Sequence, residues 1–176
     1  MDAKKPSFQT IGTLLALVIS VIALLTSIYE VNIMNSQQRA MVWPHLKLYQ
    51  SYNSEGFRIM GTNYGTGPAI VKSVEATFDG EPVAEINQLL DKMLPGRTMG
   101  YNEIGVNKLS GTVFKPEEDR MLLSLPWNEE SKAMLENLGR VNLTVCYESV
   151  LGDSWYFDFA EDETMEGVFR AEVEFD

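Results

Sequence analysis

The single histidine and the single cysteine are the residues best suited to nucleophilic chemistry. A reactive thiolate needs a neighbouring base, and His45 and Cys146 are the only residues of these two types. They fall on separate predicted strands, and Cys146 lies on the face opposite the apolar residues of its own strand. We therefore expect unrelated surface positions for the two residues. A zinc site of the usual nitrogen and sulfur kind would have to take most of its ligands from carboxylates.

Acidic residues near the C-terminus offer a second kind of chemistry. They are Asp158, Glu161, Asp162, Glu163 and Glu166. Their oxygens could bind calcium, which takes six to eight oxygen ligands, and a pair of carboxylates could hydrolyse a glycoside. The spacing is not that of an EF-hand, however, and a solvated acidic loop is the simpler interpretation. We expect no metal ion, no cofactor and no catalytic residues.

The stretch from Asn63 to Ala69, with the sequence NYGTGPA, is the most distinctive in the chain. Gly65 and Gly67 suggest positive φ angles, and Pro68 lacks a backbone donor. A phosphate-binding loop needs a helix after its glycines and a nearby lysine, whereas a proline and an apolar strand follow here. We predict a structural turn or β-bulge, in which the side chain of Asn63 bonds the turn backbone.

The composition excludes several classes of partner. The chain of 176 residues has a formal net charge of -11 and a pI near 4.5. Binding to nucleic acid requires clustered lysine and arginine, and no such cluster exists, so we expect no nucleic-acid partner. The same charge would repel the protein from anionic lipid head groups. One cysteine cannot form an intrachain disulfide.

An apolar run without charge or proline extends from Thr10 to Tyr29. About 20 apolar residues span the hydrocarbon core of a bilayer, so the sequence predicts an uncleaved signal-anchor, with a transmembrane helix at residues 10–30. The alternatives are a cleavable signal peptide and a buried helix. The run is too long for a usual signal peptide and no Ala-x-Ala-like site follows it, while its unbroken lack of charge argues against a soluble core helix. Residues 31–43 are expected to continue the helix as a juxtamembrane stalk, which Trp43-Pro44 ends.

The basic residues around this run predict its orientation. Lys4 and Lys5 precede it within a short N-terminus of residues 1–9, whereas Arg39 and Lys47 follow it at a greater distance. The positive-inside rule places the N-terminus in the cytoplasm and the soluble domain in the periplasm or outside the cell. The margin is small, and a cytoplasmic soluble domain remains the alternative.

Small residues recur on one face of the same helix. Gly12, Ala16 and Ser20 are four residues apart, a spacing that lets two helix backbones approach closely in lipid. We therefore predict self-association of the transmembrane helix along this stripe. The alternative is that small residues are simply common in such helices.

Residues 44–176 have the period-two alternation of half-buried strands. Strands are expected near 45–48, 57–62, 73–78, 121–125, 141–148, 155–159 and 169–176, with turns at Asp79-Gly80 and Gly152-Asp153. About seven short strands separated by turns are typical of an antiparallel sandwich, so the fold class is mainly β, with an N-terminal transmembrane helix.

Two short helices are expected among the strands. In the first, from Val83 to Leu94, one stripe holds Ile86, Leu89, Leu90 and Met93. The second begins after Asn128, a favourable N-cap, and Gly139 can close it. The stretch from Arg97 to Pro116 is expected to be a long loop or to hold one edge strand near residues 112–114.

The order of these features resembles a known group. A transmembrane helix, Trp43-Pro44, a strand and the motif from Asn63 to Ala69 look like a loose group of bacterial membrane-anchored proteins of unknown function. Tyr147 and the later GDSW stretch at residues 152–155 are also similar. The resemblance implies a bacterial or phage source and an immunoglobulin-like sandwich. It implies no activity and no site residues.

These observations favour a non-enzymatic, membrane-tethered β-sandwich that binds another protein or assembles with copies of itself. Open strand edges can pair with an added strand, which provides affinity through the backbone. The first alternative is a ligand-sensing membrane effector, for example in bacterial defence, with a cytoplasmic soluble domain and a basic, aromatic-lined pocket. The second alternative is a hydrolase built on carboxylates.

Overall fold

The computed structural model describes residues 8–100 and 103–175. The chain divides into two compact units, residues 1–40 and residues 41–176. Lys4 and Lys5, on which the predicted orientation depends, lie outside the described residues.

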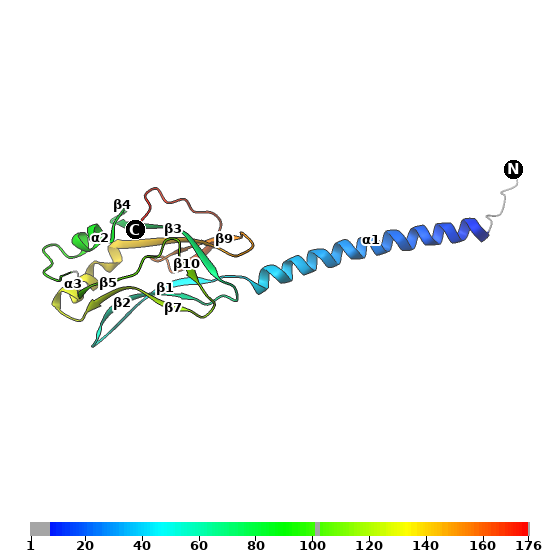
Figure 1. Cartoon of the computed structure of the whole chain (residues 1–176). Coiled ribbons are helices and arrows are strands. Elements are labelled where there is room, and N and C mark those ends of the chain that lie inside the picture. The colour runs from blue at the N-terminus through cyan, green and yellow to red at the C-terminus, as the bar shows by residue number, and fades with distance from the viewer. Residues whose placement is uncertain (1–7, 101–102, 176) are drawn as a thin grey trace. The chain divides into compact units, whose positions relative to one another are not determined.

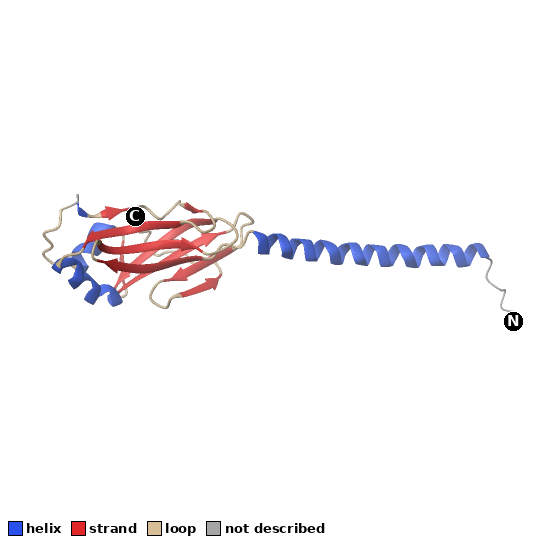
Figure 2. Ribbon diagram, turned by 90° about the horizontal axis from the view of Figure 1, so that it is seen from below, coloured by secondary structure: helices blue, strands red, loops and turns tan. Residues whose placement is uncertain are grey.

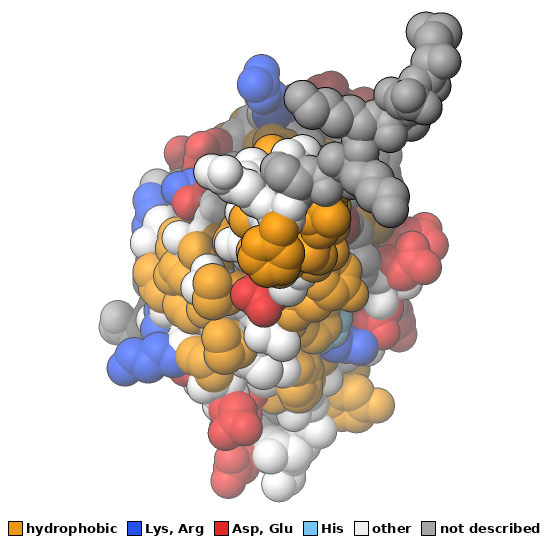
Figure 3. All heavy atoms as spheres, turned by 90° about the vertical axis from the view of Figure 1, so that its right-hand side faces the viewer, with side chains coloured by type: hydrophobic (Ala, Val, Ile, Leu, Met, Phe, Trp, Pro, Cys, Tyr) orange, Lys and Arg blue, Asp and Glu red, His pale blue; other side chains and the backbone are white. Residues whose placement is uncertain are grey.

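Helix α1 (Phe8–Met41) is one continuous apolar helix of 34 residues. Its most apolar 18-residue window has a mean hydropathy of 2.5, and it is long and apolar enough to cross a membrane. None of its residues is buried in the structure. Hydrophobic side chains (orange) gather in the middle of the face that Figure 3 shows, which is the right-hand side of Figure 1. The hydroxyls of Thr13, Ser20 and Thr26 each donate to the carbonyl four residues earlier, so these polar groups are satisfied within the helix.

The soluble unit consists of two antiparallel sheets (Figure 1). The first sheet contains, in order, β1 (Leu46–Asn53), β2 (Gly56–Asn63), β7 (Asp119–Pro126) and β5 (Gly105–Val106). The second contains β10 (Glu163–Glu166), β9 (Ser154–Asp158), β8 (Val141–Glu148), β3 (Ala69–Phe78) and β4 (Glu81–Val83), and β6 (Val113–Phe114) pairs with β3. The predicted mainly β class, with one N-terminal apolar helix, is confirmed.

The core lies between the two sheets and contains the apolar residues of the alternating segments. Leu46, Leu48, Phe57, Val145 and Tyr147 are each at most 1% exposed. The inward positions therefore follow the period-two pattern of the sequence.

Cys146 departs from that pattern. It lies on the opposite face of β8 from Val145 and Tyr147, yet it is only 4% exposed. Its neighbours on the adjoining strands are Ser73 and Tyr156, and Phe169 of the C-terminal segment packs against Tyr156. The expected surface position of Cys146 was wrong, because β8 is a central strand and its neighbours cover it.

The two short helices lie at one end of the sandwich (Figure 2). Helix α2 (Ile86–Met93) buries the predicted stripe through Leu89, Leu90 and Met93. Helix α3 (Glu129–Asn137) begins with a capping box, in which the N–H of Ser131 donates to Asn128 Oδ1 and the N–H of Asn128 donates to Ser131 Oγ, both at 2.9 Å. A 3₁₀ turn, η2 (Leu138–Arg140), follows α3 directly. Gly139 lies within that turn and does not have positive φ, so the expected glycine stop was wrong.

The turn at Asp79-Gly80 is as predicted. Both residues have positive φ, 53° and 81°, which is the conformation of a tight turn between antiparallel strands, and here they join β3 to β4.

The C-terminal strand expected from Phe169 to Asp176 was wrong for the described part of that segment. Residues 167–175 form no strand, and the last strand is β10, within the segment expected to be an acidic loop. The tight turn after β9 brings β10 into register, with Thr164 opposite Phe157. Phe175 instead packs its half-buried ring against the core, and its N–H donates to the carbonyl of Val74 at 2.9 Å.

Candidate functional site

The side chain of Asn63 joins three segments of the soluble unit. It is 0% exposed, and its Oδ1 accepts from the N–H groups of His45 and Gly65, each at 3.0 Å. Its Nδ2 donates to the carbonyls of Gly67 at 2.8 Å and Phe114 at 3.2 Å. One amide therefore links the start of β1, the turn after β2 and the end of β6.

Backbone hydrogen bonds fix the turn against the segment that precedes β1. The N–H groups of Thr66 and Gly67 donate to the carbonyl of Trp43, at 2.8 and 3.1 Å, and the N–H of Tyr64 donates to the carbonyl of His45 at 2.8 Å. The chain from Trp43 to His45 is therefore held to the β domain by its own backbone.

The two glycines of the turn are required by this close approach. A Cβ atom at Gly65 would lie 2.3 Å from the carbonyl oxygen of Trp43, and one at Gly67 would lie 2.1 Å from that of Val42. Neither glycine has positive φ, so the expectation of positive φ at these positions was wrong. The physical reason for glycine is the close approach of two backbones.

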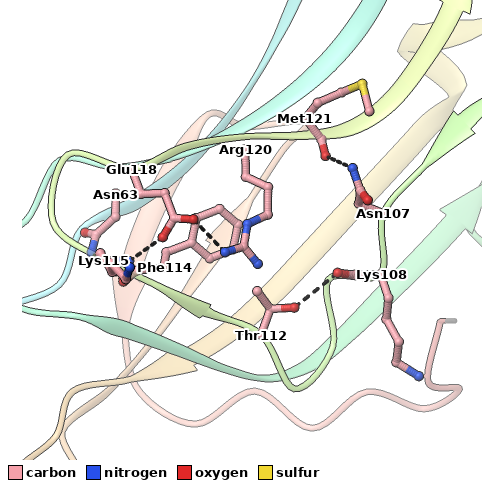
Figure 4. Close-up of polar contacts among 9 residues, drawn as sticks. All are labelled: Asn63, Asn107, Lys108, Thr112, Phe114, Lys115, Glu118, Arg120 and Met121. Atoms are coloured by element: carbon pink, nitrogen blue, oxygen red, sulfur yellow. Dashed lines mark hydrogen bonds and ion pairs between the residues drawn. The ribbon is translucent and has the colours of Figure 1, made fainter.

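The loop after β6 supports the same region (Figure 4). The carboxylate of Glu118 accepts from the N–H of Lys115 at 2.8 Å and from Nη2 of Arg120 at 2.6 Å. The guanidinium of Arg120 lies 5.0 Å from the centre of the Phe114 ring. The bond from Lys115, followed by that from Arg120, holds the pKa of Glu118 below its usual value.

The position where β1 begins decides which of its backbone groups face outward. The bond from Tyr64 to His45 makes them a hydrogen-bonded pair, and a two-residue turn joins Asn53 to Gly56 at the other end of the hairpin. Hydrogen-bonded pairs alternate along an antiparallel ladder, so Lys47, Tyr49 and Ser51 bond towards β2. The N–H and C=O groups of Leu48, Gln50 and Tyr52 then point to the other edge, where no described strand pairs with β1.

Among the strands that the structure describes, β4, β5 and β10 also lie at sheet edges and have features that hinder pairing. Strand β5 has two residues, β4 has three including Pro82, and β10 has four and begins and ends with glutamate. Shortness, proline and charge all block an added strand. Strand β1 differs, because it has eight residues, LKLYQSYN, with no proline and with one charge, Lys47, close to its first residue.

A groove of about 670 Å³ lies along the open edge of β1. Its apolar lining includes Leu48, Leu135, Leu138, Val141 and Phe159, and Tyr49, Gln50 and Tyr52 add polar groups. Across the groove, Lys47 forms an ion pair with Asp162 at 2.9 Å. The ring of Tyr52, 59% exposed, stacks on that of Trp127 with centroids 5.9 Å apart. An unpaired strand edge beside an amphipathic groove is suited to an extended peptide.

The predicted acidic residues are divided between structural and exposed positions. Asp158 accepts from the N–H groups of Ala160 and Glu161 and from Asn142, at 2.9–3.2 Å. Asp162 pairs with Lys47, whereas Glu163 and Glu166 are exposed at the two ends of β10. Within the described residues, no group of three or more His, Cys, Asp or Glu is arranged to hold a metal ion.

The structure does not bring His45 and Cys146 together. His45 precedes β1 in the first sheet, where its ring stacks on Trp43 at 5.2 Å, and Cys146 is buried in β8 of the second sheet. Gly12, Ala16 and Ser20 are all exposed on α1. The predicted packing stripe stays a prediction.

A small apolar cavity of about 70 Å³ lies in the core near α2 and α3. Its lining is aliphatic apart from three residues. Asn107 and Lys108 come from the loop before β6, and Phe175 comes from the C-terminal segment. With one basic and one aromatic residue in a mainly aliphatic lining, this cavity differs from the basic, aromatic-lined pocket expected for the sensing alternative.

Sequence reasoning identified open strand edges in general but missed the particular edge and its groove. The signal was present in the unbroken LKLYQSYN segment, whereas the groove depends on the position of β9 and α3. Comparisons with protein-family models and with curated proteins find no match. The site's geometry therefore carries the functional argument.

Proposed function

We propose that this protein is a membrane-tethered, non-enzymatic interaction module that binds an extended segment of another protein along β1. The observation that carries the proposal is the unprotected eight-residue edge of β1 beside its groove. A peptide added as a further strand would bond the outward groups of Leu48, Gln50 and Tyr52, and its side chains would enter the groove.

In this proposal α1 crosses the membrane and the β domain lies in the periplasm or outside the cell. The exposure of every described residue of α1 supports the span, because a core helix of a soluble domain would be buried. The positive charge of Lys4 and Lys5 supports the orientation. A bacterial source remains an implication of the resemblance.

We also propose that the sandwich is immunoglobulin-like. An immunoglobulin-type domain has one sheet in the order A-B-E-D facing a second that contains C-F-G. The order β1-β2-β7-β5 in one sheet, and β3-β8-β9 within the other, supports the assignment.

Photo-crosslinking at the groove tests the proposed function. Benzoylphenylalanine in place of Tyr52 puts a reactive ring beside the open edge, and Tyr64, 61% exposed near the turn, is the matched aromatic control position. In intact cells we expect a discrete adduct of higher mass from position 52 and none of that mass from position 64.

A second substitution shows whether the backbone edge makes the adduct. Gln50→Pro removes one outward N–H without touching the bonds to β2, whereas Gln50→Ala keeps that N–H. We expect the adduct to disappear in the proline variant and to persist in the alanine variant. An adduct that survives Gln50→Pro in a normally folded protein would contradict strand pairing along β1.

A further inference from the structure

We infer that the segment bound along β1 is an amphipathic strand in which apolar residues alternate with lysine or arginine. This inference rests on the proposed function and adds the chemistry of the partner. It follows from three observations. Apolar side chains form the floor of the groove, acidic side chains form its lip opposite β1, and the soluble unit has a net negative charge.

The floor of the groove determines one face of the bound strand. Leu138 and Val141 are buried, Leu135 is half-buried, and all three line the groove below the open edge. Alternate side chains of a strand point to the same face, so a strand added to β1 places every second residue over this floor. Apolar side chains at those positions bury surface, whereas charged ones would lose their hydration.

The lip of the groove determines the other face. Asp162 lines the groove, and two exposed carboxylates flank it, Glu161 in the turn between β9 and β10 and Glu163 at the start of β10. Strand β1 contributes only one charge, Lys47. Lys47 alternates with buried Leu46 and Leu48, and its ammonium contacts Asp162. In the part of the chain that the structure describes, no cation pairs with the carboxylates of Glu161 and Glu163. The start of β1, where Lys47 lies between the buried Leu46 and Leu48, therefore shows the pattern that this lip accommodates.

The charge of the whole soluble unit favours a basic partner over a second copy. Residues 41–176 contain 11 Lys and Arg against 23 Asp and Glu. Two such units repel each other, and at the edge each copy would offer the other a strand with a single lysine. A basic segment is instead attracted before contact, which increases the rate of association.

The test measures peptide binding to the full chain in nanodiscs of phosphatidylcholine, a lipid without net charge. The probes are two fluorescent, end-blocked heptapeptides, one of alternating valine and lysine and one of alternating valine and glutamate. We expect the lysine peptide to bind at least about tenfold more tightly, which corresponds to about 1.4 kcal/mol. Added salt should reduce the difference in affinity between the two peptides, because it screens charges at the exposed lip.

Two sets of variants separate the backbone contribution from the charge contribution. Gln50→Pro should weaken binding of the lysine peptide about tenfold, while Gln50→Ala stays within about threefold of the parent. The double variant Glu161→Gln and Glu163→Gln should retain binding but lose most of the preference for lysine over glutamate. The melting temperature of each variant shows whether it remains folded.

The outcomes distinguish the inference from the proposed function. If both peptides bind equally and Gln50→Pro weakens both, the edge is used and the charge inference is overturned. If the lysine peptide binds the folded proline variant as it binds the parent, both fail. If neither peptide binds, the inference fails and the crosslinking experiment decides the function. A dimer that Gln50→Pro dissociates would identify a second copy as the occupant, which also overturns the inference.

Discussion

Asn63 uses its whole hydrogen-bonding capacity inside the protein. Two of its bonds, to Gly65 and Gly67, lie within the turn, and two reach His45 and Phe114 in distant segments. A buried amide with four partners contributes stability, whereas the loss of one partner leaves a polar group unsatisfied at about 1–3 kcal/mol. The turn is thus tied to the strand that borders the groove.

Gly67→Ala is predicted to destabilise the β domain by about 1–3 kcal/mol, because the added methyl would overlap the carbonyl of Val42. The measurement is the free energy of unfolding in denaturant. Gly139→Ala is the matched control, since nothing lies within 4 Å of its Cβ position, and it should not lower stability. Equal stability of the Gly67 variant and the parent would contradict the close-approach argument.

The contacts of Glu118 predict a loss of stability in acid. Its folded-state pKa lies below the ordinary value of 4.5, so its stabilising effect is present above pH 4.5 and is lost as the pH falls through the folded-state pKa. Glu118→Gln should therefore lower the melting temperature at neutral pH, and the difference from the parent should shrink in acid. Glu161→Gln, which removes an exposed carboxylate, is the control. A pH-independent difference for Glu118→Gln would refute the electrostatic explanation.

At the scale of elements, the edge strands of the described sheets differ in their capacity to accept a further strand. Strands β4, β5 and β10 are short or carry proline or glutamate, and β1 has none of these features. Figure 1 shows the β1–β2 hairpin extending past its sheet, and its tip, residues 50–55, is exposed. Proteins that do not bind a partner through such an edge strand usually protect it against pairing.

The small-residue stripe gives the prediction for α1. If Gly12, Ala16 and Ser20 form a seam between two helices, Ala16→Ile holds the backbones apart and weakens association. Losing about four atom contacts of about 0.1–0.2 kcal/mol each removes about 0.6 kcal/mol. We therefore expect about threefold less crosslinking in native membranes at limiting expression. Leu17→Ile, one residue round the helix, is the control. Undiminished crosslinking of the Ala16 variant would assign any oligomer to the β domain.

At the scale of the whole molecule, the side of the membrane that the β domain occupies decides which partners it can meet. We predict the exoplasmic side, from Lys4 and Lys5. The test uses Glu161→Cys, because this position is exposed, whereas native Cys146 is only 4% exposed and should react slowly. An impermeant thiol reagent should label the variant in intact cells.

The parent protein provides the control for any labelling of Cys146. Labelling of Glu161→Cys only after lysis would place the domain in the cytoplasm. The ligand-sensing alternative would then replace the interaction module as the leading proposal, and the groove would have to meet a cytoplasmic partner.

The sequence by itself determined the features that depend on local patterns. An uncharged apolar run of 20 residues predicts a helix for a membrane. Period-two alternation predicted β1, β2, β3, β8 and β9, and a short apolar run predicted β7. The Asp79-Gly80 turn and the Asn128 cap were also predicted, because each depends on the conformational preference of one or two residues.

Only the tertiary structure decided the features that depend on distant neighbours. Phe169 to Phe175 alternates like a strand but forms none, while acidic β10 is a strand because it lies beside β9. Gly65 and Gly67 are glycines because residues distant in sequence approach them, which no local pattern reveals. The groove has the same origin, because Leu48, Leu138 and Phe159 meet only when the two sheets and α3 pack together. Such contacts arise from the packing of segments that are distant in the sequence, so the periodicity of one segment does not predict them.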